Sequence, residues 1–501
     1  MAQRDCESWG RLPHLRNAAR QVHPLTPHVL GADGHRSPAS PAPASPTSAL
    51  VYGNGRSYGD TCLNPGGTLY RGRAAARLLA FDTATGLITA EAGMTLATLL
   101  AITVPQGWFP PVVPGTTFVT LGGAVANDIH GKNHVTHGTF GCHVRALTLA
   151  RSDGTTRTCS TQAHAELFAA TIAGMGLTGA IMDVTLQLMR VPGPFIAERS
   201  QRFDTLDEFA ALCLEADRLH AYSVAWIDTM ARGHATGRGI MMVGDHAAAP
   251  AVPGGVDGNG NNDGNRDGDG LTGANPPSEM PSGSRVLTPR LSVPFAPPVS
   301  LINRLTLRPM TAAYFHRHPP EPRLRRVPYH GFFFPLDGIG RWNRIYGPHG
   351  FYQHQCLIPL DRAGSEHAAM LDALDHVRAL IAITQDAGEG SFLTVLKRFG
   401  AYTSPGLMSF PREGLTLTMD FANRGARTLA MLERLDACVR ETGGRICLYK
   451  DARMSRETFA HGYPNAIRFA EQIDPGFSSQ QWRRLTGEGA DKPARGRPVH
   501  A

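Results

Sequence analysis

The sequence predicts an α+β fold that is divided between more than one domain. Helix-like and strand-like patterns alternate along the chain, and the strand-like segments are short and interrupted by glycine, which argues against a TIM barrel. The 501 residues also exceed the size of a typical domain, which is about 150 residues. No internal repeat of about 20 to 50 residues is visible, so a solenoid is not expected.

Apolar side chains at helical spacing predict four amphipathic helices. The first begins with a threonine in the position of an N-cap, and the second begins with a threonine and a glutamate in the spacing of a capping box. The four helical segments are expected at residues 95–102, 205–213, 370–381 and 429–439. Strands are expected at residues 222–227, 352–358, 392–396, 416–421 and 445–449.

The segment 416–421 alternates cleanly between apolar and polar side chains. Its three polar side chains share one face of the expected strand: Thr416, Thr418 and Asp420. Such a face either lines a substrate pocket or meets solvent, and both alternatives remain open.

Charge and cysteine usage narrow the class of protein. The 49 Lys and Arg against 42 Asp and Glu give a formal net charge of +7, which we expect to be spread along the chain. Without a block of about five or six like charges, nucleic-acid binding is not favoured. The 8 cysteines include no C-x-x-C pair, which excludes a zinc ribbon and fits a reducing compartment. Because neither a secretory signal nor a run of about 18 apolar residues is found, we expect a cytoplasmic protein.

Three stretches have compositions that cannot form a core. Residues 36–49 are rich in Pro, Ala and Ser, and residues 246–285 are rich in Gly, Asn, Asp and Pro, so both are expected to be disordered spacers. Residues 487–501 are expected to form a disordered tail. Residues 263–268 match half of a calcium-binding loop, but Ala274 stands where a glutamate is needed, so we assign the match to chance.

Two glycine-rich segments point to a bound ligand. In residues 53–60, three glycines let successive N–H groups turn inward and hold anionic oxygens such as those of a pyrophosphate, although an ordinary hairpin turn fits equally. In residues 114–141, glycine and small hydroxyl residues recur, which permits close approach to a planar ligand. A plain loop of that length is uncommon. The histidines at 130, 134 and 137 suggest a metal, but Gly131 and Gly138 argue against the required helix, so no metal is predicted.

Residues 174–179 match the G-x-G-x-x-G fingerprint of dinucleotide-binding folds. That fingerprint requires a strand before it and a helix after it. Here a helical pattern, residues 165–172, comes before the glycines, and a strand-like pattern, residues 180–188, follows them. The reversed order excludes a Rossmann NAD site and leaves a helix-to-strand turn that can still contact a cofactor.

Taken together, residues 53–60, 114–143 and 174–182 resemble the FAD-binding half of the vanillyl-alcohol-oxidase superfamily, whose FAD domain is of the PCMH type. Further short matches resemble the decaprenylphosphoryl-β-D-ribose 2′-oxidase family, and they lie at residues 9–11, 55–60, 128–134, 140–144, 342–347, 391–397 and 450–453. The resemblance implies a two-subdomain FAD-binding domain over residues 1–193 that the chain re-enters at 445–486. It implies an α+β substrate domain with an antiparallel sheet over residues 194–444.

The resemblance implies that FAD is held without a covalent bond, because Arg56 and Ser57 stand where covalent relatives place a histidine. The implied FAD contacts are Gly53, Asn54, Gly55, Arg56, Ser57, Tyr58, Gly59, Pro114, Gly115, Thr116, Thr117, Gly122, Gly123, Asn127, Asp128, His130, Gly131, Asn133, Gly138, Thr139, Gly141, Gly176, Gly179 and Ile181.

The implied activity is oxidation of the 2′-hydroxyl of a polyprenyl-phosphoryl pentose to a ketone, with hydride transfer to flavin N5. This is the first half of a ribose-to-arabinose epimerisation in cell-wall glycan biosynthesis. The implied partners are an NAD(P)H-dependent short-chain reductase, a quinone or O₂ as electron acceptor, and the inner membrane as a peripheral contact. The implied catalytic residues are Lys450, His130, Gln355 and Lys397. The implied substrate contacts are Trp226, Thr416, Thr418 and Asp420, and charge suggests that Lys132 meets the phosphate.

Two departures from the family bear on the substrate. Thr418 stands where the mycobacterial member carries a cysteine, and Thr416 replaces an asparagine, so the polarity of the pocket differs. One alternative is an FAD-dependent oxidase of a free sugar, an alditol or an aldonolactone, although the His-Trp-x-Lys motif of aldonolactone oxidases is absent. Another alternative is a flavin-binding protein without turnover.

Overall fold

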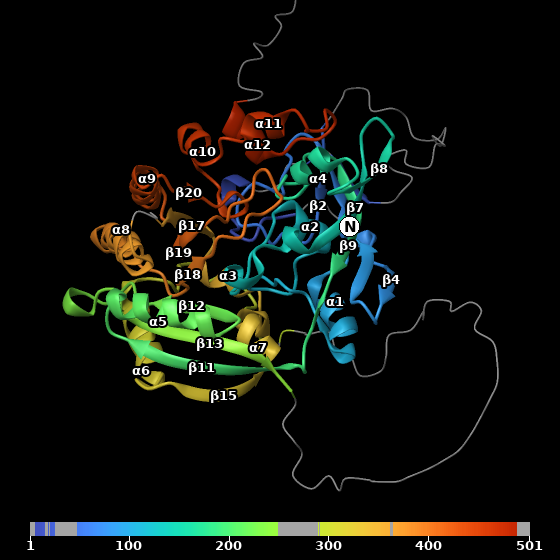
Figure 1. Cartoon of the computed structure of the whole chain (residues 1–501). Coiled ribbons are helices and arrows are strands. Elements are labelled where there is room, and N and C mark those ends of the chain that lie inside the picture. The colour runs from blue at the N-terminus through green and yellow to red at the C-terminus, as the bar shows by residue number, and fades with distance from the viewer. Residues whose placement is uncertain are drawn as a thin grey trace, which may run out of the picture.

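The computed structural model describes residues 6–15, 19, 21–25, 48–248, 289, 291–360 and 364–487. Over these residues the α+β class is confirmed, with three larger sheets and helices packed around them (Figure 1). Most of the spacers and of the tail predicted from composition lies outside the described residues. At their edges the prediction was wrong, because Ala49 begins strand β2 (Ala49–Tyr52) and Ala247 ends strand β13 (Gly239–Ala247).

The N-terminal half contains two of the larger sheets. A small parallel sheet has the order β1 (Gln21–Pro24), β3 (Thr68–Arg71), β2. An antiparallel sheet has the order β4 (Leu78–Asp82), β5 (Leu87–Glu91), β9 (Ala180–Gln187), β7 (Val144–Ala150), β8 (Thr156–Ser160). Helices α1 (Leu96–Thr103), α2 (Leu121–Ala126) and α4 (Ala165–Thr171) share one apolar core with this second sheet. The turn between α4 and β9 confirms the helix-then-strand order expected around residues 174–179.

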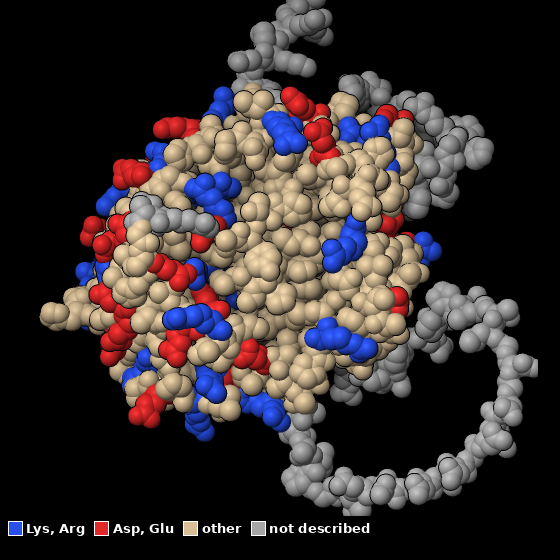
Figure 2. Space-filling view, in the orientation of Figure 1, with Lys and Arg blue, Asp and Glu red and all other residues tan. Residues whose placement is uncertain are grey.

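The third sheet has eight antiparallel strands. Its order is β15 (Arg323–Pro328), β11 (Phe195–Phe203), β13, β12 (Tyr222–Ile227), β18 (Val395–Phe399), β19 (Gly414–Ala422), β17 (Phe351–Pro359), β20 (Arg445–Ile446). Helices α5 (Leu206–Leu219), α8 (Glu366–Asp386) and α9 (Ala426–Glu441) cover one face of this sheet (Figure 1). The outer surface of these helices carries intermixed acidic and basic side chains (Figure 2), as is typical of helices that face solvent.

Shorter elements complete the described chain. They are β6 (Trp108–Phe109), β10 (Met189–Arg190), β14 (Leu291–Ser292), β16 (Ile339–Gly340), α3 (His134–His137), α6 (Arg304–Arg317), α7 (Tyr329–Phe333), α10 (Arg456–Gly462), α11 (Ala466–Ala470), α12 (Gln480–Thr486) and the 3-10 turns η2 (Pro13–Leu15), η4 (Gly72–Ala74), η5 (Val104–Gln106), η6 (Phe140–His143), η7 (Gly233–Ala235), η8 (Pro335–Gly338), η9 (Trp342–Tyr346) and η10 (Leu448–Lys450). Within the described residues, no helix is both long and apolar enough to cross a bilayer.

The four predicted helices all form, and their caps are as expected in part. The side chain of Thr95 accepts a hydrogen bond from the N–H of Thr98 at the start of α1. Thr205 accepts from the N–H of Glu208, but the Glu208 carboxylate accepts from the N–H of Asp204 rather than closing the capping box. In α9 the predicted apolar stripe begins wrongly, since Leu429 is exposed and Met431 is buried instead.

Three local predictions were wrong. Strand β18 begins at Val395, so residues 392–394 are not part of it, and β20 ends at Ile446 because the chain turns into η10. Residues 134–137 form one turn of helix, α3, which was not expected next to two glycines. The turn ends at Gly138, whose φ of 65° is the left-handed conformation that terminates helices.

After β20 the chain contacts the N-terminal half again. Ala49 accepts a hydrogen bond from Ser478 N and donates one to Gly476 O, which joins β2 to the segment before α12. Strand β20 itself still pairs with β17, so the residues just after 444 belong to the eight-stranded sheet. The exact domain boundaries at residues 193 and 444 remain predictions.

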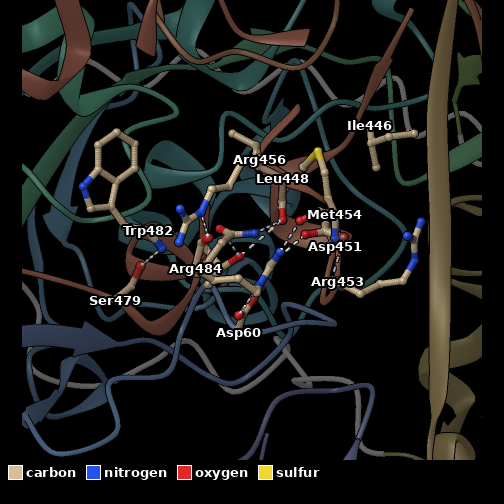
Figure 3. A network of polar contacts seen from close by, with 12 residues as sticks. Asp60, Ile446, Leu448, Asp451, Arg453, Met454, Arg456, Ser479, Trp482 and Arg484 are labelled. Carbon is tan, nitrogen blue, oxygen red and sulfur yellow. Dashed lines mark hydrogen bonds and ion pairs between the residues drawn. The ribbon is translucent and has the colours of Figure 1, made fainter. Parts of the chain in front are cut away.

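Arg484 on α12 binds two carboxylates that lie far apart in the sequence (Figure 3). Its guanidinium donates to both oxygens of Asp60 at 2.9 Å and to Asp451 at 2.7 Å. Both carboxylates are buried. Burial raises the pKa of Asp60, and the bonds from Arg484 oppose that rise. The three residues therefore form one buried charge cluster that joins the first glycine-rich turn to the end of the chain.

We expect Arg484→Met to lower the free energy of unfolding by about 3 to 5 kcal/mol, because it leaves two buried carboxylates without their cation. Urea denaturation followed by circular dichroism measures this change. Arg468→Met is the matched control, since its ion pair with Glu166 is exposed on both sides and contributes less than about 1 kcal/mol. Equal losses in the two variants would contradict the proposed importance of the cluster.

Candidate active site

A cavity of about 970 Å³ lies where the N-terminal half meets the face of the eight-stranded sheet opposite the helices. This volume is near the upper end of the range for ligand sites, about 300 to 1,000 Å³. The N-terminal half contributes residues 53–58 and many of the residues within 113–132 and 175–181 to its lining. The sheet contributes side chains from β12, β13, β17, β18 and β19, and η10 contributes Tyr449 and Lys450.

Most of the predicted site residues line this cavity. Among the predicted FAD contacts these are Gly53, Asn54, Gly55, Arg56, Ser57, Tyr58, Pro114, Gly115, Thr116, Gly122, Gly123, Asn127, His130, Gly131, Gly176, Gly179 and Ile181. The predicted catalytic residues Lys450, His130, Gln355 and Lys397 and the predicted substrate contacts Lys132, Trp226 and Thr418 line it as well. Residues from eight separate stretches of the chain thus converge on one site.

Nine predicted residues do not line the cavity, and their contact with a ligand remains a prediction. They are Gly59, Thr117, Asp128, Asn133, Gly138, Thr139, Gly141, Thr416 and Asp420. Their polar groups hold the wall from behind: Thr117 donates through its N–H and its hydroxyl to Asp337, at 2.7 and 2.8 Å. The buried carboxylate of Asp128 accepts from the N–H of Gly141 and from two serine hydroxyls.

The first glycine-rich turn is shaped for close approach of a ligand. Gly55 has a φ of 60°, and a Cβ at this position would lie 2.1 Å from the hydroxyl of Tyr52. Any side chain here would be both strained and obstructed. Arg56 on the same turn stacks its guanidinium over Trp9, 4.2 Å from the ring centroid, and over Phe118 at 4.9 Å. A fixed cation therefore stands on a turn where the backbone can be approached closely, which suits an anionic group such as a pyrophosphate.

Several buried polar atoms in the cavity wall lack a hydrogen-bond partner within the described chain. They are Oδ1 of Asn127, Oε1 of Gln355 and Nε of Arg56. Buried polar groups in folded proteins are nearly always hydrogen-bonded. Unpaired polar atoms around one cavity therefore indicate where a ligand would form hydrogen bonds. The two amide oxygens can accept from ring N–H or hydroxyl groups, and Nε of Arg56 can donate to phosphate oxygens, so together with the glycine turn they fit a nucleotide cofactor.

Three lysines surround the cavity in a chain that has only four. Lys132, Lys397 and Lys450 line it, and the fourth, Lys492, lies outside the described residues. The remaining 45 of the 49 basic residues are arginines. Lysine differs from arginine in carrying a compact ammonium group whose pKa shifts readily on burial. The concentration of lysines indicates that this chemistry is needed in the cavity.

The three ammonium groups have lowered pKa values. Burial, and then repulsion from Lys450 and Lys132, lower the pKa of Lys397 to about 7. Burial lowers the pKa of Lys132 to about 8, against the attraction of Glu198. Burial also lowers the pKa of Lys450, with Cys447 and Asp420 opposing. The cavity therefore favours an anionic ligand, which would relieve the repulsion.

His130 is held in a chain of hydrogen bonds. Its Nε2 lies 3.0 Å from the amide nitrogen of Gln355, which also donates to the hydroxyl of Thr416 at 2.9 Å. Its Nδ1 lies 2.9 Å from the hydroxyl of Tyr449. Burial, followed by repulsion from Lys397 and Lys450, holds the pKa of His130 well below its usual value. With the amide donating to Nε2, the neutral ring carries its proton on Nδ1 and donates it to Tyr449.

The sequence analysis missed several residues of the cavity. Tyr449, Tyr314, Phe333, Asp337 and Gln353 line it. Only Tyr449 had a local signal, because it stands next to Lys450; the others come from segments whose patterns carry no mark of a site. Among the described residues, no three His, Cys, Asp or Glu side chains gather as metal ligands would.

Comparison with known proteins identifies the family. The FAD binding domain family matches residues 41–160. A decaprenylphosphoryl-β-D-ribose oxidase from Mycolicibacterium smegmatis is 32% identical over 443 residues, which cover 87% of this chain and 88% of that protein. The chain belongs to the decaprenylphosphoryl-β-D-ribose oxidase family.

Other relatives show how far the likeness extends. An uncharacterised protein from the mprA 5′ region of Streptomyces coelicolor is 33% identical over 403 residues, 78% of this chain and 100% of that protein. Bovine L-gulonolactone oxidase is 34% identical over 137 residues, which are 27% of this chain and 31% of that enzyme. Membership of the decaprenylphosphoryl-β-D-ribose oxidase family confirms an FAD-dependent oxidoreductase with a PCMH-type FAD-binding domain, acting on CH–OH groups.

The lowered pKa of Lys397 predicts how the stability of the cofactor-free protein depends on pH. An unfolded lysine has a pKa of about 10.4, so between about pH 7 and 10 the unfolded state binds more protons, and stability rises with pH. We expect Lys397→Met to flatten this rise and to be more stable than the wild type at pH 7. Urea unfolding at pH 7 and 9 tests this, with Lys397→Arg as the control that keeps the charge. An unchanged pH slope in Lys397→Met would contradict the lowered pKa.

Proposed function

We propose that this enzyme oxidises the 2′-hydroxyl of a polyprenyl-phosphoryl pentose to a ketone. The observation that carries the proposal is the gathering of three of the four lysines around a cavity that also has the glycine turn of an FAD site. One anionic group, the cofactor pyrophosphate, fits the turn beside Arg56. A second anion, the substrate phosphate, fits Lys132, which lies further along the cavity. The name of the mycobacterial relative supports a decaprenylphosphoryl ribose substrate.

Lys132 is suited to the substrate phosphate. Its ammonium donates to the carbonyl of Phe332 and lies 4.2 Å from the centroid of that ring. Aromatic side chains of Trp226, Tyr314 and Phe333 line the same cavity and offer flat apolar surface to a sugar ring or an isoprenoid tail. The indole N–H of Trp226 already donates to the carbonyl of Phe392 at 2.7 Å, so this ring contributes its face.

Proton transfer falls to Lys397. A base works best when its pKa is near the working pH, and the pKa of Lys397 is about 7. Neutral Lys397 can accept the proton of the sugar hydroxyl, while His130 and Gln355 orient that hydroxyl through hydrogen bonds. When bound, FAD accepts the hydride from the carbinol carbon. Lys450 supplies a positive charge that balances the negative charge gained in this step.

The 2′-ketone product requires two further reactions, its reduction to the epimeric alcohol and the reoxidation of the flavin. A ketone at C2′ becomes the epimeric alcohol when an NAD(P)H-dependent short-chain reductase returns a hydride to the other face. That pair of reactions converts a ribosyl to an arabinosyl donor for cell-wall glycans. A quinone or O₂ would reoxidise the flavin, and the enzyme would work on the cytoplasmic side, at the membrane that contains its lipid substrate.

The yellow colour of bound flavin provides the direct test. Purified protein should show the absorption of oxidised FAD, and anaerobic addition of a polyprenyl-phosphoryl ribose should bleach it. Free ribose, alditols and aldonolactones should bleach it at least a hundredfold more slowly, since they lack the phosphate that Lys132 binds. Equal bleaching by free sugars would instead support a soluble sugar oxidase. A flavin that no substrate bleaches would support a binding protein without turnover.

The assignment of Lys397 predicts a pH profile. We expect kcat to rise with pH as Lys397 loses its proton, and Lys397→Met to lower kcat by about 10² to 10⁴-fold and to lose that limb of the profile. The content of FAD should stay the same, because the base is separate from the glycine turn. The profile is measured by stopped-flow bleaching between pH 6 and 9. If the same limb persists in Lys397→Met, the base is another group.

A further inference from the structure

A surface segment next to the cavity exposes an unusual amount of apolar side chain. We call it the strap and define it as residues 291–308 together with 339–346. It carries six of the 14 large apolar side chains that are exposed in the described chain, namely Leu291, Phe295, Val299, Leu301, Leu305 and Ile339. Leu305 is 87% exposed, Leu291 and Val299 are 70% exposed, and Phe295 is 67% exposed. Exposed apolar residues concentrated in one place mark an interaction site.

The two parts of the strap are joined by backbone hydrogen bonds. β14 pairs with β16 in parallel, so that Leu291 lies opposite Ile339. The N–H of Val293 donates to the carbonyl of Gly340 at 2.9 Å, and the N–H of Leu301 donates to the carbonyl of Ile345 at 2.9 Å. The guanidinium of Arg344 donates to the carbonyl of Val293 at 3.1 Å. The exposed side chains are therefore presented by one connected piece of backbone.

The same region holds most of the excess positive charge of the protein. The strap itself contains four arginines and no acidic residue, and residues 291–346 as a whole, with eight arginines and two acidic residues, carry a formal charge of +6 against +7 for the whole chain. The expectation that this charge is spread along the chain was wrong. Residues 291–320 and 338–350 contain no Asp or Glu, and Arg304, Arg308 and Arg341 are exposed. The strap thus combines apolar side chains with arginine and lacks carboxylates.

The strap is also a wall of the cavity. Ser292, Gly340, Arg341 and Trp342 line the cavity, whereas Leu291, Phe295 and Val299 are exposed. A molecule that is released from a partner bound to the strap is therefore already next to the cavity. Among the exposed apolar residues, Ile339 belongs to both surfaces.

We propose that the strap docks the enzyme on an anionic phospholipid bilayer, with its apolar side chains inserted among the lipid headgroups and its arginines on the phosphates. This inference rests on the proposed function, because a lipid-linked substrate explains why the enzyme would approach a bilayer at the cavity. The substrate can then pass from the membrane past the strap into the cavity. Cations beside shallowly inserting apolar groups are the pattern of interfacial membrane binding. The core of a protein interface would instead be rich in aromatic residues, and Phe295 is the one exposed aromatic side chain of the strap.

Flotation of the full-length FAD-loaded protein with vesicles tests the proposal. We expect it to float with vesicles of phosphatidylcholine and phosphatidylglycerol, to float much less with phosphatidylcholine alone, and to be released by salt. The double variant Phe295→Ser/Leu305→Ser should lose at least tenfold in partitioning. Arg308→Gln should lose about fivefold, as expected for one basic residue near an anionic surface. The control is Ile467→Ser on α11, which is 80% exposed and lies at the other end of the molecule from α6 (Figure 1).

A second measurement separates this proposal from the proposed function. Bleaching by a short-chain polyprenyl-phosphoryl ribose in detergent should be the same in the double variant and the wild type, which also shows that the variant is folded. Bleaching by the same substrate embedded in vesicles should fall in parallel with flotation. A wild type that bleaches in detergent but does not float would overturn the docking surface alone. A wild type that floats but does not bleach would overturn the proposed function alone.

Two further results would overturn the bilayer as the partner. In one, the double variant and Ile467→Ser float equally well. In the other, sedimentation shows that the wild type self-associates and that the double variant does not, which would make the strap an interface between two copies of the chain.

Discussion

The structure depends on the buried bonds from Arg484 to Asp60 and Asp451 (Figure 3). Asp60 ends the first glycine-rich turn, and Asp451 follows Lys450 directly. Holding both carboxylates on one guanidinium fixes the turn against the segment that carries the lysine. The backbone agrees with this, because the N–H of Tyr58 donates to the carbonyl of Tyr449 at 3.2 Å. A Cβ on Gly59 would lie 1.5 Å from the carbonyl oxygen of Asp451, so only glycine permits the approach.

This arrangement brings positive charges together at a cost in stability. Lys397 has a lowered pKa because it is buried and lies near the ammonium groups of Lys450 and Lys132. In the cofactor-free protein these positive charges repel one another in the cavity. Such strain at a functional site is relieved when a ligand of opposite charge binds. The same repulsion that weakens the empty protein thereby strengthens the binding of an anion, and it leaves one lysine near neutrality and able to accept a proton.

The two threonines Thr416 and Thr418 bear on the site in different ways. Thr418 lines the cavity, so its side chain meets any ligand there directly. Thr416 lies behind the lining and accepts a hydrogen bond from Gln355, which in turn contacts His130. A change at position 418 therefore alters the surface offered to the substrate, while a change at position 416 acts through the orientation of an amide and an imidazole.

Local patterns were enough to predict the parts of the fold that local physics controls. The N-cap at Thr95, the apolar stripe of α8 and the reversed order around residues 174–179 follow from neighbouring residues alone. The glycine spacing at 53–59 predicted a turn, but left open whether it binds a ligand or is an ordinary hairpin turn. The short strand β20 and the start of β18 were wrong, because their ends depend on pairing with β17 and β12.

What only the tertiary structure decided is which residues meet. The sequence by itself determined most of the helices and strands and the family resemblance. It could not show that Tyr449 pairs with His130 or that Thr117 donates to Asp337. Nor could it show that the strap is at once an exposed apolar surface and a wall of that cavity. These contacts join residues that are far apart in the sequence. Their free energy comes from burial and electrostatics in the folded state, and local sequence patterns do not reveal either.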